Sequence, residues 1–309
     1  MFATLALTIT LAAATTAAGT APGPATLQRS EADSIRRAIE KDREETRTWL
    51  KTAPNSYLAT VQRVEFLFKT TLTVGRGGGD VRLEDPAIRP THLTVTVLGD
   101  SFKVQAIDDS ASFKVKGAEV REAVVGPSAI EVGRYTLRLS HQRYPAIIVF
   151  DPQSPRYQAY KGIEYYPVDL KWRYVLPLTP NARADTMVIA STRGYQRRAV
   201  LAGWFDFMAG GTKCRLEAHR LLEPGVGESD IAVFFRDATT GKDTYSVGRY
   251  IDPVRLPGGE FVLDFNTAYN PACAYSEHYN CPIPPRRNRL AMEVRAGEKD
   301  SHYLEHTAP

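Results

Sequence analysis

Apolar and polar residues alternate along most of the chain after residue 55, as expected for β-strands with one buried face. The alternating stretches are short, and turn residues such as Gly99-Asp100 and Gly210-Gly211 separate them. They predict strands at residues 64–68, 93–98, 102–107, 113–115, 135–139, 146–150, 186–190, 204–208, 213–218, 231–235, 261–265 and 290–294. No crossover helix lies between them, so a mainly β fold with antiparallel sandwiches or barrels is expected rather than a parallel α/β sheet.

Residues 30–52 differ, because their apolar positions recur at helical spacing. Ser30 and Asp33 match a capping box, and Pro54 ends the helix. The centre of this helix, residues 41–45, is entirely charged, so we expect the helix to pack only at its two ends.

An apolar run at residues 2–14, followed by small residues to Ala21, opens the chain. The run is shorter than the roughly 20 residues that span a bilayer, so it is typical of a secretion signal rather than an anchor. We therefore expect a signal peptide over residues 1–21 and a periplasmic or secreted protein. No Lys or Arg precedes the run, which leaves a cytoplasmic protein with an Ala/Thr-rich N-terminus as the alternative.

The length of 309 residues allows two domains, each with its own core. The expected division is a helix over 28–54, a first β-domain over 55–145, a second over 146–299 and a tail over 300–309. The net charge is only +4 and the basic residues are scattered, which argues against a nucleic-acid partner.

Common catalytic and cofactor motifs do not occur. The Gly-rich residues 75–79 precede a strand-like segment instead of a helix, so they predict a turn and not a phosphate loop. Glu298, His302 and His306 have helical spacing, but they lie in a polar tail that favours a solvated terminus. We therefore predict no cofactor and no metal.

The segment 264–285 has prolines that exclude a helix or a central strand. Loops beyond about 12–15 residues are usually functional or disordered, and the tyrosines and asparagines here favour an ordered loop. In an oxidising compartment Cys273 and Cys281 are the natural disulfide pair, with Cys214 left as a buried thiol. Zinc bound by Cys273, His278 and Cys281 fits no common spacing, and no base is assigned to a nucleophilic Cys273.

Two interpretations of this loop remain open. It could be a stapled plug that closes one end of a β-domain, or it could line a pocket for a small polar molecule. In the second case Asp264 or Glu298 is the candidate general acid or base, because catalysis requires a titratable group. The ligand-binding candidates are Arg249, Asn266, Tyr269, Asn270 and Asn288.

Several motifs resemble a bacterial family known as domain of unknown function 1684. They include Asp264-Phe265-Asn266, Ala268-Tyr269-Asn270-Pro271, Cys281-Pro282, Asn288-Arg289-Leu290, Ala296-Gly297-Glu298-Lys299 and the upstream Gly248-Arg249-Tyr250. The resemblance covers roughly residues 30–299 and implies no established activity. Family members usually carry an arginine in the strand before the position of Asp151, whereas residues 147–150 are apolar here.

The first half is similar to a forkhead-associated β-sandwich, through Gly75-Arg76, His92 and the strands up to residue 135. Such modules bind phosphothreonine through the arginine after the glycine and a serine three places before the histidine. That position is Arg89 in this chain, so the resemblance implies a scaffold rather than a phosphopeptide partner. The expected function is binding or hydrolysis of a small polar molecule, with a non-catalytic envelope module as the alternative.

Overall fold

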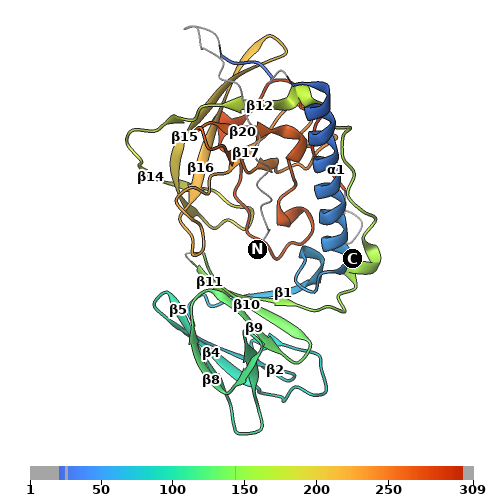
Figure 1. Cartoon of the computed structure of the whole chain (residues 1–309). Coiled ribbons are helices and arrows are strands. Elements are labelled where there is room, and N and C mark those ends of the chain that lie inside the picture. The colour runs from blue at the N-terminus through green and yellow to red at the C-terminus, as the bar shows by residue number, and fades with distance from the viewer. Residues whose placement is uncertain (1–20, 25–26, 143, 302–309) are drawn as a thin grey trace.

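Two β-rich units and one long helix form the molecule in the computed structural model (Figure 1). The structure describes residues 21–24, 27–142 and 144–301, so the expected signal peptide and the tail histidines lie largely or entirely outside the described residues. The mainly β fold predicted from the sequence is confirmed. No helix in the described ranges is both long enough and apolar enough to cross a membrane.

The first unit is a sandwich of two sheets. One sheet has the order β1-β11-β10-β9-β6-β7 and the other β3-β2-β4-β5-β8. Their bounds are β1 Thr60–Glu65, β2 Thr71–Gly75, β3 Val81–Arg82, β4 Leu93–Leu98, β5 Ser101–Ala106, β6 Phe113–Val115, β7 Ala118–Val120, β8 Glu122–Val125, β9 Ser128–Val132, β10 Tyr135–Gln142 and β11 Tyr144–Phe150. Leu72, Val95, Phe102, Leu137 and Val149 belong to the core between them.

The end of the first unit lies beyond the expected boundary at residue 145. Strand β11 pairs with both β1 and β10, with Ile148 opposite Arg63 on one side and Arg138 on the other. Residues 146–150 therefore belong to the first sandwich, in a strand that lies between β1 and β10. Their continuous apolar pattern fits a strand that is buried on both faces.

The second unit is built on the long hairpin of β15, Arg197–Ala209, and β16, Thr212–Leu221. Gly210 and Gly211 both have positive φ, as a two-residue hairpin turn requires, so the turn predicted there is confirmed. The other strands are β12 Arg173–Leu176, β13 Thr179–Pro180, β14 Thr186–Ile189, β17 Val233–Phe235, β18 Arg249–Ile251, β19 Val254–Arg255 and β20 Phe261–Asp264.

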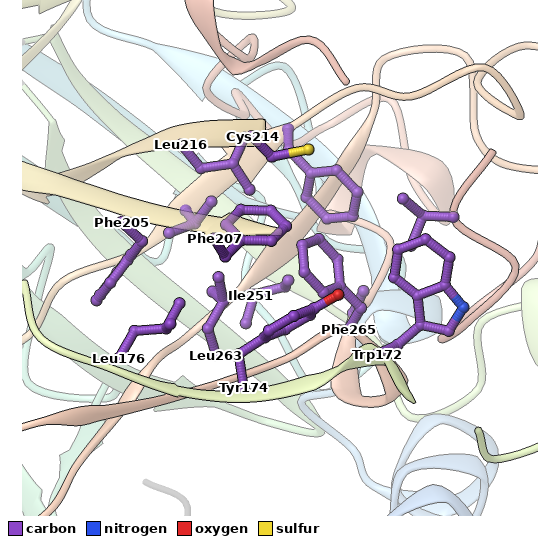
Figure 2. Packing of buried hydrophobic residues seen from close by; sticks show 14 of the residues in the cluster. Trp172, Tyr174, Leu176, Phe205, Phe207, Cys214, Leu216, Ile251, Leu263 and Phe265 are labelled. Carbon is purple, nitrogen blue, oxygen red and sulfur yellow. The ribbon is translucent and has the colours of Figure 1, made fainter. Parts of the chain in front are cut away.

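Aromatic rings fill the core of the second unit (Figure 2). Phe265 lies at its centre, where its ring contacts those of Trp172, Tyr174, Phe207 and Phe235. Because Phe265 directly follows β20, the loop that begins at this residue is fixed to the core from its first position.

Helix α1, Arg29–Thr52, runs along the second unit (Figure 1). Its N-cap is Gln28, with no side-chain cap, so the expected capping box at Ser30 and Asp33 is wrong. The expectation that its charged centre stays unpacked is also wrong. Arg43 is only 4% exposed and donates a 3.1 Å hydrogen bond to the backbone carbonyl of Asn266, so a charged residue joins helix and loop.

Residues 290–294 form no strand, contrary to the alternating pattern. The amide of Leu290 donates to the carbonyl of Arg236, but the amide of Val294 donates to the carboxylate of Asp237. The side chain of Asp237 thus takes the hydrogen bond that the amide of Val294 would make to a neighbouring strand, so no strand forms here. The remaining short helices are η1 Tyr57–Ala59, α2 Arg156–Ala159, η2 Leu170–Trp172, η3 Phe265–Thr267, η4 Ala272–Ala274 and η5 Arg286–Asn288.

Candidate functional site

The residues predicted to form one site lie at several places in the second unit. Asp264 ends β20 and binds Arg173 on the paired strand β12, with 2.7 Å between Oδ2 and the guanidinium nitrogen. Its other carboxylate oxygen accepts hydrogen bonds from the backbone and side-chain amides of Asn266. Both oxygens of this carboxylate are bound by protein groups. Asp264 therefore fixes the start of the loop and has no oxygen directed at a reactant.

Asn266 is fully buried and acts as a connector. Its Oδ1 accepts from the backbone amide of Asp169 at 2.8 Å, and its Nδ2 donates to the carbonyl of the same residue at 3.0 Å. The amide of Asn266 thus pairs with both backbone groups of Asp169, as a neighbouring strand would do. In this way it satisfies backbone groups in a segment that has no regular secondary structure. Together with Arg43 on its carbonyl, it fixes three segments to one another.

Arg249, on β18, is 1% exposed and clamps the C-terminal segment. One guanidinium nitrogen lies 2.9 Å from Asp237 and 2.9 Å from the carbonyl of Val294. The other donates to the carbonyls of Ala296 and Glu298. The buried ion pair and the three carbonyl acceptors thus occupy both terminal nitrogens of the guanidinium.

Asn288 holds a third place, between β16 and β17. Its Oδ1 accepts from the amide of Glu217 at 2.7 Å, while its Nδ2 donates to the carbonyls of Glu217 and Phe234, each at 2.8 Å. The side chain is completely buried and joins the backbones of β16 and β17.

Glu298 lies with Asn270 in a buried polar cluster against helix α1. The carboxylate accepts from the amide of Asn270 at 2.7 Å and from the hydroxyls of Tyr275 at 3.1 Å and Tyr165 at 3.4 Å. Burial raises the pKa of Glu298 to about 7, although these hydrogen bonds act to lower it. The Oδ1 of Asn270 is buried without a partner.

These side chains therefore do not converge on a shared hollow. Asp264, Asn266, Arg249 and Asn288 point into solid packing, so the ligand and catalytic roles expected for them find no support in their contacts. Tyr269 is the exception among the predicted residues, because it lines a cavity.

That cavity measures about 200 Å³ and lies where the loop meets β1, β10 and β11 of the first unit. The loop and the second unit contribute one wall of this cavity, and the first unit contributes the other. Figure 1 shows the two units one beside the other. Its lining residues are Tyr57, Arg63, Arg138, Ser140, Gln142, Ile148, Arg197, Tyr250, Tyr269, Pro271, Ala272, Tyr279, Asn280, Cys281 and Pro282.

Charge in the cavity comes from three arginines with different environments. Arg63 pairs with Glu65 at 3.1 Å, and Arg197 pairs with Glu223. Arg138 has no ion pair or hydrogen bond with any residue in the described ranges. Arg138 is solvent-exposed, and it is the one lining arginine whose charge has no carboxylate partner among the described residues.

The phenol groups around Arg138 remain neutral donors at physiological pH. Burial raises the pKa of Tyr279 to about 12 and that of Tyr57 further, while the charge of Arg138 acts weakly in the opposite direction on both. The hydroxyl of Tyr279 is bound to Thr60 at 2.9 Å, whereas that of Tyr57 has no hydrogen-bond partner in the described part of the chain.

Cys273 and Cys281 are free thiols in the structure, as is Cys214, so the disulfide predicted between the first two is not formed. The two cysteines are nevertheless adjacent, because the backbone amide of Cys273 donates to the sulfur of Cys281 at 3.2 Å. The described residues contain no cluster of three metal-binding side chains.

A family model for a protein of unknown function, DUF1684, matches residues 158–299. Residues 158–299 belong to the DUF1684 family. Its match covers the second unit and the whole loop, and it ends one residue after Glu298. The wall of the cavity that carries Arg63 and Arg138 lies outside the DUF1684 match.

Solved structures similar to this chain include an uncharacterized protein of Haloarcula marismortui. It is 32% identical over 48% of this chain and 82% of that one, with a TM-score of 0.39. The forkhead-associated domain of FhaA, complexed with the intracellular domain of Rv3910, is 20% identical over 25% of this chain and 78% of that one. A forkhead-associated domain from a phosphothreonine-dependent interaction is 22% identical over 26% and 75%, and both TM-scores are 0.20. No curated protein matches the sequence.

Sequence patterns could not have revealed the cavity residues of the first unit of this chain. Arg138 alternates with buried Leu137 and Leu139 on β10, so it has the pattern of an ordinary solvent-facing residue. Only the docking of the loop against that face of β10 places Arg138 beside Tyr57 and Tyr279.

Proposed function

We propose that the chain binds a small polar anion in the cavity between the two units. The observation that carries this proposal is the guanidinium of Arg138, which has no carboxylate partner although it lies in a cavity with two paired arginines. A carboxylate or phosphate oxygen is the natural acceptor for such a group. The hydroxyl of Tyr57 supplies a second donor beside it.

Size restricts the ligand. The volume of about 200 Å³ is below the range of roughly 300–1,000 Å³ that is typical of drug-sized ligands. Tyr250, Tyr269 and Tyr279 add aromatic faces to the polar donors. A compact anion, with or without one small ring, fits this composition.

Binding is favoured over hydrolysis. None of the described residues that line the cavity is Asp, Glu or His, the usual general bases. Ser140 and Cys281 line the cavity, but no carboxylate or imidazole among the lining residues could act as a general base for hydrolysis by either of them. The candidates Asp264 and Glu298 are engaged elsewhere, by Arg173 and by Asn270.

The cellular setting belongs to the same proposal. The apolar residues 2–14 support export, with the protein acting in the periplasm or outside the cell. N-terminal sequencing of the protein from such a compartment should show cleavage near Ala21. An intact Met1 on the mature protein would contradict export.

A non-catalytic structural module is the second candidate function. It is favoured by the side chains of Arg249, Asn266 and Asn288, all of which are used to hold backbone segments together. On this alternative the cavity is a packing defect, and no small anion stabilises the protein.

Calorimetry and thermal unfolding with inorganic phosphate, acetate and benzoate distinguish the two. We expect at least one of these anions to bind and to raise the melting temperature, because a ligand that binds only the folded state stabilises it. Arg138→Gln should weaken that binding about tenfold or more, as expected when a charge-assisted hydrogen bond is lost.

Arg121→Gln is the matched control, since Arg121 is an exposed arginine of the same unit that pairs with Asp109 at 2.7 Å, outside the cavity lining. This variant should bind like the original protein. Absence of binding by all three anions, or equal binding by the Arg138→Gln protein, would favour the structural module.

A further inference from the structure

Cys273 and Cys281 form a pair that the anion-binding proposal does not use. Cys273 lies in η4, and Cys281 lies eight positions later on the same loop. Both residues are nearly buried, at 5% and 6% exposure. The sulfur of Cys281 accepts a 3.2 Å hydrogen bond from the amide of Cys273, which places it against the backbone of its partner.

The surroundings hold both cysteines in position. The hydroxyl of Tyr245 donates to the carbonyl of Cys273 at 3.1 Å and reaches its sulfur at 3.7 Å. On the other side, Thr192 fixes Cys281 twice, since its Oγ1 accepts from the amide at 3.1 Å and its own amide donates to the carbonyl at 3.0 Å. Neither backbone can move away without breaking these contacts.

The thiols also interact with each other directly. Hydrogen bonding from the Cys281 thiol is the main cause that lowers the pKa of Cys273, whereas burial chiefly raises the pKa of Cys281. Of the two thiols, that of Cys273 therefore ionises more readily.

One of the two cysteines lies at the cavity. Cys281 lines the cavity, which is open to solvent, whereas Cys273 is not one of its lining residues. A molecule as small as hydrogen peroxide can enter a space of about 200 Å³. Cys214 differs, because it lies in the separate aromatic core of the second unit (Figure 2).

We propose that Cys273 and Cys281 form a redox-active dithiol that hydroperoxides entering the cavity convert to a disulfide. The sulfur of Cys281 attacks one peroxide oxygen and the O–O bond breaks. The proton of the Cys281 thiol passes to the leaving oxygen, so that a sulfenic acid forms and water or alcohol leaves. The sulfur of Cys273 then attacks the sulfur of Cys281, and the S–O bond breaks with release of water. Two thiols are oxidised by two electrons in total, and the peroxide is reduced by the same two.

The experiment uses the full chain, treated with a small excess of hydrogen peroxide, then denatured, alkylated and weighed. Before alkylation, we expect the treated protein to weigh 2 Da less than the reduced protein. After alkylation, we expect one cysteine to carry the label. Peptide mapping of the same sample should show the peptides of Cys273 and Cys281 joined, and dithiothreitol should restore three reactive thiols.

Variants test the assignment. Cys214→Ser should still lose 2 Da, while Cys281→Ser should not, and Cys273→Ser should stop at a sulfenic acid that dimedone labels on Cys281. Three alkylated cysteines after peroxide treatment, or a bridge that involves Cys214, would overturn the proposal. The mapping of the original chain decides the matter even if a variant fails to fold, and it needs no anion ligand.

Discussion

The carboxylate of Glu298 lies 2.7 Å from the backbone amide nitrogen of Asn270, inside a buried cluster. Two residues 28 positions apart are thus joined by a group whose ionised form is disfavoured by burial. Tyr165 and Tyr275 donate to the same carboxylate, so the cluster connects the loop, the C-terminal segment and the region that helix α1 covers.

The raised pKa of Glu298 makes stability depend on pH in a defined direction. The folded protein holds this proton up to pH about 7, whereas a carboxyl with the ordinary pKa of 4.5 releases it earlier in the unfolded chain. The contribution of Glu298 to the free energy of unfolding is therefore fully present below pH 4.5. It is lost as the pH rises through 7, by about 3 kcal/mol in total.

Glu298→Gln should remove this dependence, because an amide keeps the shape and cannot ionise. The variant should be at least as stable as the original protein at pH 8 and should gain on it by about 3 kcal/mol between pH 4.5 and pH 8. Urea unfolding at both pH values measures the difference. Glu293→Gln, at an exposed carboxylate, is the control, and equal pH profiles for all three proteins would contradict the assignment.

Loss of Arg249 should be among the most damaging single changes in the second unit. Arg249→Met leaves Asp237 as a buried charge and deprives three carbonyls of their donor, at a cost of about 3–5 kcal/mol. Urea unfolding gives the value. Arg215→Met removes an exposed arginine 2.8 Å from Asp206 and should cost under about 1 kcal/mol, so similar losses would show that burial is not decisive.

Asn288→Ala tests the link between β16 and β17. Three hydrogen bonds to the backbone of Glu217 and Phe234 disappear, and the stranded groups stay buried, which should lower the free energy of unfolding by about 2–4 kcal/mol. Asn181→Ala, in a turn on the surface, should change it by less than about 1 kcal/mol. Thermal unfolding ranks the two, and the reverse order would refute the connecting role.

Gly297 and Gly241 have the same φ of +78° but different surroundings. A Cβ at Gly297 would lie 2.5 Å from the carbonyl oxygen of Ala268, whereas one at Gly241 meets nothing within 4 Å. Both alanine variants carry the cost of a left-handed residue, about 1–2 kcal/mol, and Gly297→Ala adds the clash. Its melting temperature should therefore be clearly lower than that of Gly241→Ala, and equal values would contradict the tight approach.

Local pattern determined much of the fold. Strands β4 and β6 have the bounds that alternation predicts, and the diglycine turn joins β15 to β16, because both signals depend only on neighbouring residues. The helix was also visible locally, although the burial of Arg43 in its charged centre was not. Residues 290–294 alternate like a strand, yet Asp237 takes the amide of Val294 that a strand would offer to its neighbour.

Composition alone indicated that the segment after Asp264 matters, since its prolines, tyrosines and asparagines require an ordered loop. It could not assign roles within that loop. The sequence does not distinguish an asparagine or arginine that binds a ligand from one that binds a backbone carbonyl. The partners of Asn288 and Arg249 lie far from them in the sequence. The tertiary structure alone decided that these residues hold the fold together, because only packing determines which polar groups lose water and which, like Arg138, face a cavity.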